Sequence, residues 1–315
     1  MERYRERAEN TARLIDVNLN LSLDLPQDAG RQWAPVVHAT GDWDLFESRY
    51  RAADEKNVLE FLTFDLNNPN SILSCLTRAR ENAQSIRQII TTDMWSELNT
   101  LYLYVKSAAG KSGRKASAYE FYNRIKRHSH LFTGIFRMSM THDEAWHFAR
   151  MGSLLERADQ TSRLIDVKYF ILLPAVDYVG TPYDDILWAA LLKSASAFEM
   201  YRRRWGQIHP RHVLEFLVLD QTFPRSIDYC ISETDKSLRT ITGGAPDPVI
   251  VRLKSRVDQL QGDEIISGGV HEFMESLQQN VCDISEGITS AFFGTMHAPA
   301  PRPAARAMEF TQQES

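Results

Sequence analysis

The segment ERAENTARLIDV at residues 6–17 returns as ERADQTSRLIDV at residues 156–167, with nine of the twelve positions identical at a spacing of 150 residues. Two unrelated segments of average composition share roughly one position in twelve. A second pair, VLEFLTFDLNNPNSI at 58–72 and VLEFLVLDQTFPRSI at 213–227, agrees at nine of fifteen positions at a spacing of 155. Because the pairs occur in the same order in both halves, the sequence predicts an internal duplication of a unit of about 150 residues.

The repeated segments have the apolar spacing of α-helices. Apolar and small residues recur at intervals of three and four, which places them on one face of a helix. In the two copies these residues are Ala8, Ala12 and Ile15, and Leu155, Ala158, Ser162 and Ile165. The same spacing predicts helices over 40–65, 70–92, 93–108, 117–140, 141–172, 183–206, 209–220, 225–241, 247–261 and 268–293. No segment shows a convincing strand alternation, so we predict an all-α helical bundle built from two pseudo-symmetric repeats.

The predicted organisation is a single helical domain followed by a tail. Repeat one covers residues 1–140, repeat two covers 141–296, and the Pro/Ala-rich segment 297–315 is expected to be disordered. Residues 107–117 form a basic Gly/Ser-rich loop between helices. Pro69 and Pro224 interrupt the helical pattern at matching places, and each is expected at the first position of the next helix.

Composition excludes several classes of protein. Apolar residues make up 43% of the 315 positions, which is typical of a globular chain. The net charge of −5 disfavours nucleic acid as a partner. The three cysteines form no CxxC pair, and no apolar run is long enough to cross a membrane. We therefore expect a cytoplasmic protein that does not bind a membrane.

Charged residues form a second stripe beside each apolar seam. Glu6, Glu9, Arg13 and Asp16 share one helix face, Glu156, Asp159, Arg163 and Asp166 repeat them, and Arg7 and Arg157 complete a Glu-Arg pair in each copy. Because the stripe borders the core, we expect it to be half-buried. It is either an ion-pair network that fixes helix packing or a polar site that holds a metal or a cationic ligand. Four-helix carboxylate metal sites usually add Glu-x-x-His, which neither copy has, and this favours the network.

The candidate polar site therefore consists of Glu6, Arg7, Glu9, Arg13, Glu156, Arg157, Asp159 and Arg163. We predict that the two helices carrying it pack against each other near a pseudo-twofold axis. The sequence indicates no metal site and no cofactor.

A second candidate site is confined to the first copy. Arg78, Arg80 and Arg87 supply the residue type that binds anions through two parallel hydrogen bonds. The second copy has Asp235 and Lys236 opposite Arg80 and Glu81, which is a charge swap that equally suits complementary packing. Packing is the favoured interpretation, and a phosphate or carboxylate site is the alternative.

Three further patterns have simpler structural explanations. His142 and His147 are five residues apart, which is not the spacing of a helical metal pair, so a helix cap at Thr141 is favoured over a loop metal site. The AAGKS stretch at 108–112 resembles the end of a phosphate-binding loop but lacks its first glycine and its preceding strand. Cys75 and Cys230 occupy equivalent helical positions and are expected in the core.

The motifs resemble those of the bacterial alpha-E domain family, an all-helical family of unknown biochemical function named for its Glu-Arg motif. The resemblance covers residues 1–296 and rests on ERAENTARLIDVN at 6–18, FDLNNPNSI at 64–72, RARENAQSIR at 78–87, MWSELNTLYLY at 94–104 and GSLLERADQTSRLID at 152–166. Members of this family usually begin some twenty residues earlier, so the resemblance implies either a late start codon or a shortened first core helix.

The resemblance implies a setting but no chemistry. The family typically occurs beside a circularly permuted ATP-grasp protein and a transglutaminase-like protein, which implies a cytoplasmic system that makes, attaches or removes a peptide or peptide tag. Only the motif maps onto this chain, at Glu6-Arg7 and Glu156-Arg157. The leading interpretation is a non-catalytic helical partner of the ATP-grasp peptide ligase. The alternative is an enzyme that uses the carboxylates of the motif, with or without a metal, in peptide or amine chemistry.

Overall fold

A computed structural model of the chain describes residues 1–24, 33–109, 118–170, 182–244 and 269–294, together with positions 248, 250, 251, 254, 262 and 265. The regular structure of these residues is entirely helical, which confirms the predicted all-α fold. Within this part of the chain, no helix is long and apolar enough to cross a membrane. The segment 297–315, most of the loop at 107–117 and most of the helix expected over 247–261 lie outside the described residues.

The helices of the first part of the chain are α1 (Glu2–Asp24), α2 (Ala34–Thr40), α3 (Trp43–Arg49), α4 (Glu55–Thr63), α5 (Ile72–Ser85), α6 (Thr92–Ala108) and α7 (Ala118–Ser139). Those that follow are α8 (Glu144–Phe170), α9 (Pro182–Ser194), α10 (Phe198–Trp205), α11 (Pro210–Leu214), the π-helix η3 (Glu215–Leu219), α12 (Ile227–Thr242) and α15 (Val270–Phe293).

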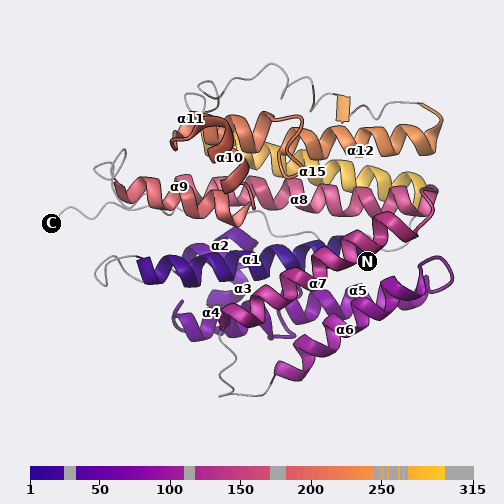
Figure 1. Cartoon of the computed structure of the whole chain (residues 1–315), viewed down its shortest axis with the longest axis horizontal. Coiled ribbons are helices and arrows are strands. Elements are labelled where there is room, and N and C mark those ends of the chain that lie inside the picture. The colour runs from indigo at the N-terminus through magenta and orange to yellow at the C-terminus, as the bar shows by residue number, and fades with distance from the viewer. Residues whose placement is uncertain are drawn as a thin grey trace.

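Helices α1 and α8 lie next to each other at the centre of the molecule (Figure 1). Helix α1 also packs against α5 and α7, and α5 packs in turn against α6. On the other side, α8 packs against α12 and α15. Two shorter helices cross between the halves, because α2 packs against α8 and α9 packs against α1. The α1–α8 pair is therefore the element around which the rest of the chain is arranged.

Two hydrophobic clusters flank this central pair. One is built from residues between Ala8 and Trp146, and the other from residues between Met151 and Ile288. The apolar seam of α1 belongs to the first cluster and the seam of α8 belongs to the second, as their helical spacing predicts. Because each seam turns toward its own cluster, the charged stripes are left to face the opposite central helix.

Two segments expected as single helices are interrupted. The segment 40–65 contains α3 and α4, separated at residues 50–54, and the segment 183–206 contains α9 and α10, separated at residues 195–197. Helix α4 begins where the Asp54 side chain accepts a hydrogen bond from the backbone N–H of Asn57. Such a cap starts a helix at a defined residue. Apolar spacing misses this break because buried apolar residues occur on both sides of it, Phe46 in α3 and Val58 in α4.

Serine caps, not prolines, start helices α5 and α12. The Ser71 and Ser226 hydroxyls each accept a hydrogen bond from a first-turn backbone N–H, at 3.1 Å. Pro69 and Pro224 lie two residues before these caps, so the prediction that each occupies the first helical position is wrong. A serine cap satisfies one of the free N–H groups of the first turn, which a proline at that position does not do.

Helix α8 also begins at a cap, although not at the expected residue. The Asp143 carboxylate, rather than Thr141, accepts a hydrogen bond from the backbone N–H of Trp146 at 3.2 Å. The His142 ring stacks on the Trp146 indole, with 3.9 Å between centroids. Asp143 therefore caps α8, and His142 packs against its first turn.

Candidate functional site

The two Glu-Arg motifs meet where α1 packs against α8, and this confirms the predicted packing of their helices. Arg7 donates from Nε and Nη2 to the two carboxylate oxygens of Glu156, at 2.6 and 2.7 Å. Arg157 donates in the same way to Glu6, at 2.8 and 3.1 Å. Each glutamate is therefore held by two hydrogen bonds from the arginine of the other motif, the strongest geometry of an arginine–carboxylate pair.

These side chains are more buried than the sequence predicts. Glu6 is 1% exposed and Glu156 is 3% exposed, and Arg7 and Arg157 are buried as well. The expectation of a half-buried stripe is wrong, because the stripe on each central helix faces the other central helix. Charges in such a place are tolerated only when they are paired and hydrogen-bonded, as these four are.

The surroundings of Glu156 are balanced in charge. Arg7 also donates from Nη1 to Asn70 at 2.5 Å, and Asn70 donates to Asp42 at 2.6 Å. Arg163 pairs with Asp159 at 3.0 Å. Burial raises the pKa of Asp42, which favours its neutral form. We call Arg7, Asn70, Glu156, Asp159 and Arg163 the Glu156 cluster; it contains two arginines and two carboxylates.

The surroundings of Glu6 are richer in arginine. Arg5 and Arg225 lie 3.1 and 3.4 Å from the Glu6 carboxylate, in addition to Arg157. Glu9 pairs with Arg13 and, at 3.1 Å, with Arg225. The Glu6 cluster consists of Glu2, Arg5, Glu6, Glu9, Arg13, Arg157 and Arg225. Its four arginines face three carboxylates, so the cluster carries one positive charge in excess.

The excess charge moves the ionisation of these groups. Burial by itself raises the pKa of Glu6, but Arg157, Arg225 and Arg5 together outweigh burial and hold that pKa well below its usual value. Burial and repulsion from Arg225 hold the pKa of Arg13 well below its usual value. Burial, opposed by Glu6 and assisted by Arg157, lowers the pKa of Arg225 to about 10. The fold therefore stabilises the carboxylate of Glu6 and disfavours full charge on two of its arginines.

Glu6 is expected to make the fold sensitive to acid. Its folded pKa lies below its usual value of 4.5, so its contribution to stability is complete above pH 4.5 and is lost as the pH falls through the folded value. In urea unfolding, the stability difference between the wild type and Glu6→Gln should be constant above about pH 4.5 and shrink below it. Glu47→Gln, on the exposed face of α3, is the control and should differ little from the wild type at any pH. A difference for Glu6→Gln that is the same at pH 7 and pH 3 would contradict the assignment.

Three members of the Glu6 cluster, Glu2, Arg5 and Arg225, were missed by the sequence analysis. Arg225 aligns with Asn70 when the segments 58–72 and 213–227 are matched at a spacing of 155, so a charged residue stands in one segment where the other has a neutral one. That substitution, in a segment that joins two helices, was the available signal. Arg5 lies one position before Glu6, outside the repeated segment, and its donation to Ser129 on α7 could not be read from local spacing.

The ends of the two charged stripes lead away from the central pair. Asp16 accepts a hydrogen bond from Lys126 on α7 at 2.6 Å. Asp166 lies 2.7 Å from Nδ1 of His271 on α15. These contacts tie each central helix to its own flanking helix, so the last carboxylate of each stripe does not reach the other motif.

The three arginines of the second candidate site lie against aromatic rings. Arg80 and Arg87 both lie over Trp95, at 5.4 and 5.8 Å from the ring centroid, and Arg78 lies over Tyr4 at 5.7 Å. Arg80 also donates to Asn99 at 2.7 Å. The structure thus brings Arg80 and Arg87 to one ring of α6 and turns Arg78 toward α1. On α12, Asp235 pairs with Arg239 of the same helix, at 2.7 Å.

The cysteines and histidines take up structural positions. Cys75 and Cys230 are fully buried, as predicted, and burial raises the pKa of each thiol to about 12. His128 contacts Glu97 at 2.5 Å, whereas His130 lies on another side of α7, 3.6 Å from Glu9. In the described part of the chain, no three His, Cys, Asp or Glu side chains are placed to hold a metal ion together.

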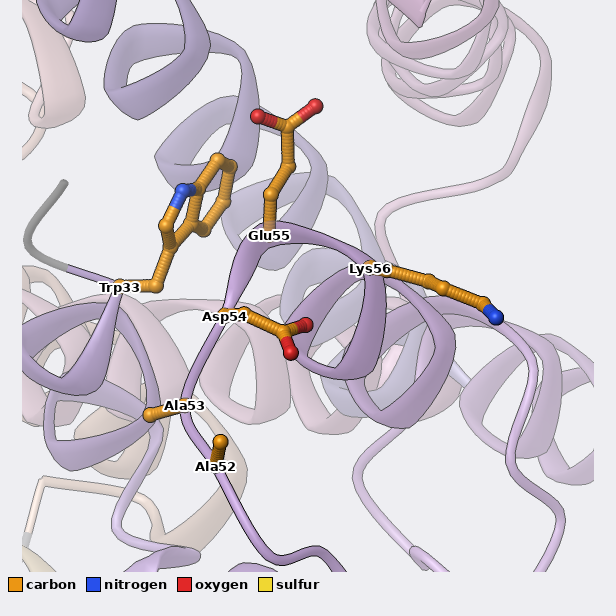
Figure 2. Close-up of a pocket in the computed structure, with 6 residues that line it drawn as sticks. All are labelled: Trp33, Ala52, Ala53, Asp54, Glu55 and Lys56. Atoms are coloured by element: carbon orange, nitrogen blue, oxygen red, sulfur yellow. The ribbon is translucent and has the colours of Figure 1, made fainter.

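A surface pocket lies apart from both clusters. Figure 2 shows its lining, which consists of Trp33 and residues 52–56. Within it the Asp54 carboxylate is already engaged as the cap of α4, while Glu55 and Lys56 extend in different directions. None of the residues singled out from the sequence as a candidate site lines this pocket.

Comparison with known proteins gives a family but no activity. An uncharacterized protein of Mycobacterium tuberculosis strain H37Rv is 23% identical over 320 residues, covering 92% of this chain and 36% of the relative. An uncharacterized protein of Mycobacterium bovis is 22% identical with the same coverage. The chain thus spans about a third of the length of these curated relatives, and no solved structure matches it. The family model that matches residues 1–293 is described as a predicted alpha-helical domain with a conserved ER motif, and the chain belongs to this Alpha-E family.

Proposed function

We propose that the chain is a non-catalytic helical partner of a peptide-ligase system that contains a circularly permuted ATP-grasp protein and a transglutaminase-like protein. The observation that supports this most directly is that Glu6 and Glu156 are each paired with the arginine of the other motif. Both oxygens of each carboxylate accept hydrogen bonds from a guanidinium, and both side chains are buried. A carboxylate in this state is committed to holding two helices together and is a poor base or metal ligand.

The identity of the partners and the cytoplasmic setting come from the resemblance to the alpha-E family described above. The curated relatives add support of a different kind. In them the matching region makes up about a third of a longer chain, so it is joined to further sequence. This arrangement favours a helical unit that acts together with other domains.

The proposal includes the duplication. We propose that repeat one, residues 1–140, and repeat two, residues 141–296, are copies that face each other across the α1–α8 pair. Its support is that the arginine of each motif, Arg7 or Arg157, pairs with the glutamate of the other motif. The matching Cys75 and Cys230 add to it, since their thiols contact the carbonyls of Pro69 and Pro224 at 3.8 and 3.7 Å.

Co-purification tests the partner role. The tagged chain should retain a circularly permuted ATP-grasp protein from its own organism. Glu156→Gln should retain it equally per folded molecule, because the substitution affects helix packing and not a binding surface. Purified chain should contain far less than one metal ion per molecule by elemental analysis. Failure to retain either companion would contradict the partner role. A Glu156→Gln protein that melts within about a degree of the wild type but has lost ligase-dependent activity would favour the enzyme alternative.

A further inference from the structure

The Glu6 cluster borders two buried hydrogen-bond donors that have no acceptor. Nε of Arg13 and Nδ2 of Asn10 are without a partner, although these residues are only 3% and 8% exposed. The Oδ1 atom of Asn10 accepts a hydrogen bond from Arg225 at 2.9 Å, which places the amide beside that guanidinium. Asn10 contacts Arg225, and Arg13 contacts Glu9, which itself pairs with Arg225. Leaving a buried donor unsatisfied costs free energy, so an acceptor from outside the chain would stabilise either donor.

The charge of the cluster indicates what kind of acceptor fits. Glu6 already accepts two hydrogen bonds from Arg157, and Glu9 already pairs with Arg13. Arg225 thus contacts carboxylates that already have an arginine partner, and its charge leaves the cluster with one positive charge in excess. An anion would remove that excess, and oxygen atoms would satisfy the free N–H groups.

The Glu156 cluster is the internal comparison. At the position equivalent to Arg225 by the repeat spacing it has Asn70, and its two arginines are matched by two carboxylates. Packing α1 against α8 therefore does not require the additional arginine. The packing of α1 against α8 does not explain the additional arginine in the Glu6 cluster.

Two exposed residues, Ser196 and His130, contact the region. Arg13 donates from Nη1 to Ser196, an exposed residue in the turn between α9 and α10. Ser196 has a φ of 51°, which side chains rarely adopt and which marks a turn fixed by its surroundings. His130 of α7 is 3.6 Å from Glu9 and its side chain is 65% exposed. Ser196 and His130 thus flank the Glu9–Arg13 pair at the surface.

We propose that Arg13, Asn10 and Arg225 bind a small oxyanion, a carboxylate or phosphate group, that enters between Ser196 and His130. Guanidinium groups bind both kinds of oxyanion through paired N–H donors. The anion accepts hydrogen bonds from Arg13 Nε and Asn10 Nδ2 and neutralises the charge that Arg225 adds. This site is independent of the partner role, because it would bind the anion whether or not an ATP-grasp protein is present.

Thermal unfolding at constant ionic strength tests the site. Sodium acetate and sodium phosphate at pH 7 are compared with sodium chloride, and the two arms distinguish carboxylate from phosphate. At roughly ten times its dissociation constant, the bound anion should raise the melting temperature of the wild type by about 3 °C. Arg225→Asn introduces at position 225 the residue found at position 70, and it should abolish the shift in melting temperature. Arg204→Asn, which removes an exposed arginine paired with Asp220, is the matched control and should keep it.

Phosphate also stabilises proteins without binding to a site, so the difference between the wild type and Arg225→Asn decides the outcome. The proposal is overturned if neither anion raises the wild-type melting temperature above that in chloride, or if Arg225→Asn responds as the wild type does.

A measurement on the unaltered protein keeps the test independent of mutant folding. Burial, together with Arg13, Arg225 and Arg5, lowers the pKa of His130, while Glu6 opposes them and Glu9 lies nearby. An anion bound among these arginines should raise the His130 pKa, followed by NMR of its ring proton in acetate, phosphate or chloride. A His130 pKa that is equal in all three salts at matched ionic strength would contradict the site.

Discussion

Replacing Glu6 by glutamine is expected to lower the free energy of unfolding by about 4 kcal/mol, because breaking a buried ion pair typically costs about 3–5 kcal/mol. The substitution leaves four arginines of the Glu6 cluster facing two carboxylates, and three of those arginines lie within 3.4 Å of the residue that changes. Glutamine keeps the shape of the side chain, so the loss reports charge and not volume.

Glu156→Gln is the matched comparison and should cost less, about 2 kcal/mol, which is typical of a lost hydrogen bond to a charged group. Its arginine, Arg7, keeps a hydrogen bond to Asn70, and the rest of its cluster is balanced. Exposed Glu47→Gln should stay within about 0.5 kcal/mol of the wild type. Urea unfolding of the three variants at pH 7 measures the order. Equal losses at Glu6 and Glu156 would show that the additional arginines do not act on Glu6.

Reversing the charge of Arg7 is expected to have the second large effect. In the wild type, Nε and Nη2 of Arg7 donate to Glu156 at 2.6 and 2.7 Å. Arg7→Glu replaces these donors with a second carboxylate beside Glu156 and should lower the free energy of unfolding by about 4 kcal/mol. Combining it with Glu156→Arg rebuilds an ion pair of opposite direction between α1 and α8. The double variant should therefore be more stable than the sum of the single losses predicts, by roughly 2 kcal/mol.

A double-mutant cycle in urea checks this coupling. Arg78→Glu is the control partner, because Arg78 lies on the exposed side of α5 and contacts Tyr4 rather than Glu156. Its combination with Glu156→Arg should be additive within about 0.5 kcal/mol. Additive losses for Arg7→Glu and Glu156→Arg would mean that the Arg7–Glu156 ion pair contributes no specific interaction energy.

These effects are large because a polar layer separates two apolar clusters. The seams of α1 and α8 face away from each other, so hydrophobic burial alone does not fix how far one helix slides along the other. Each arginine fork reaches one glutamate, and the two forks run in opposite directions. We infer that the pair of bridges helps to set the register of the central helices, which is the best-attested role of buried polar groups.

The fold class followed from local pattern because helix formation depends on neighbours three and four residues apart. The seams through Ala12 and Ala158 were visible in the sequence, and both are fully buried. Helix breaks were less visible. The start of α4 depends on a hydrogen bond from Asn57 to Asp54, and the start of α8 on one from Trp146 to Asp143, and neither changes the apolar spacing.

The repeated motif by itself determined which residues would meet, since identical charged residues beside two apolar seams are most simply buried against each other. It did not determine how deeply they are buried or what surrounds them. Arg5 is adjacent to Glu6 on α1, whereas Arg225 and Ser196 reach the Glu6 cluster from two later segments of the chain. Only the tertiary structure decided that one motif is balanced and the other is left with a positive charge and two free donors, because charge balance is a sum over groups that are close in space and distant in sequence.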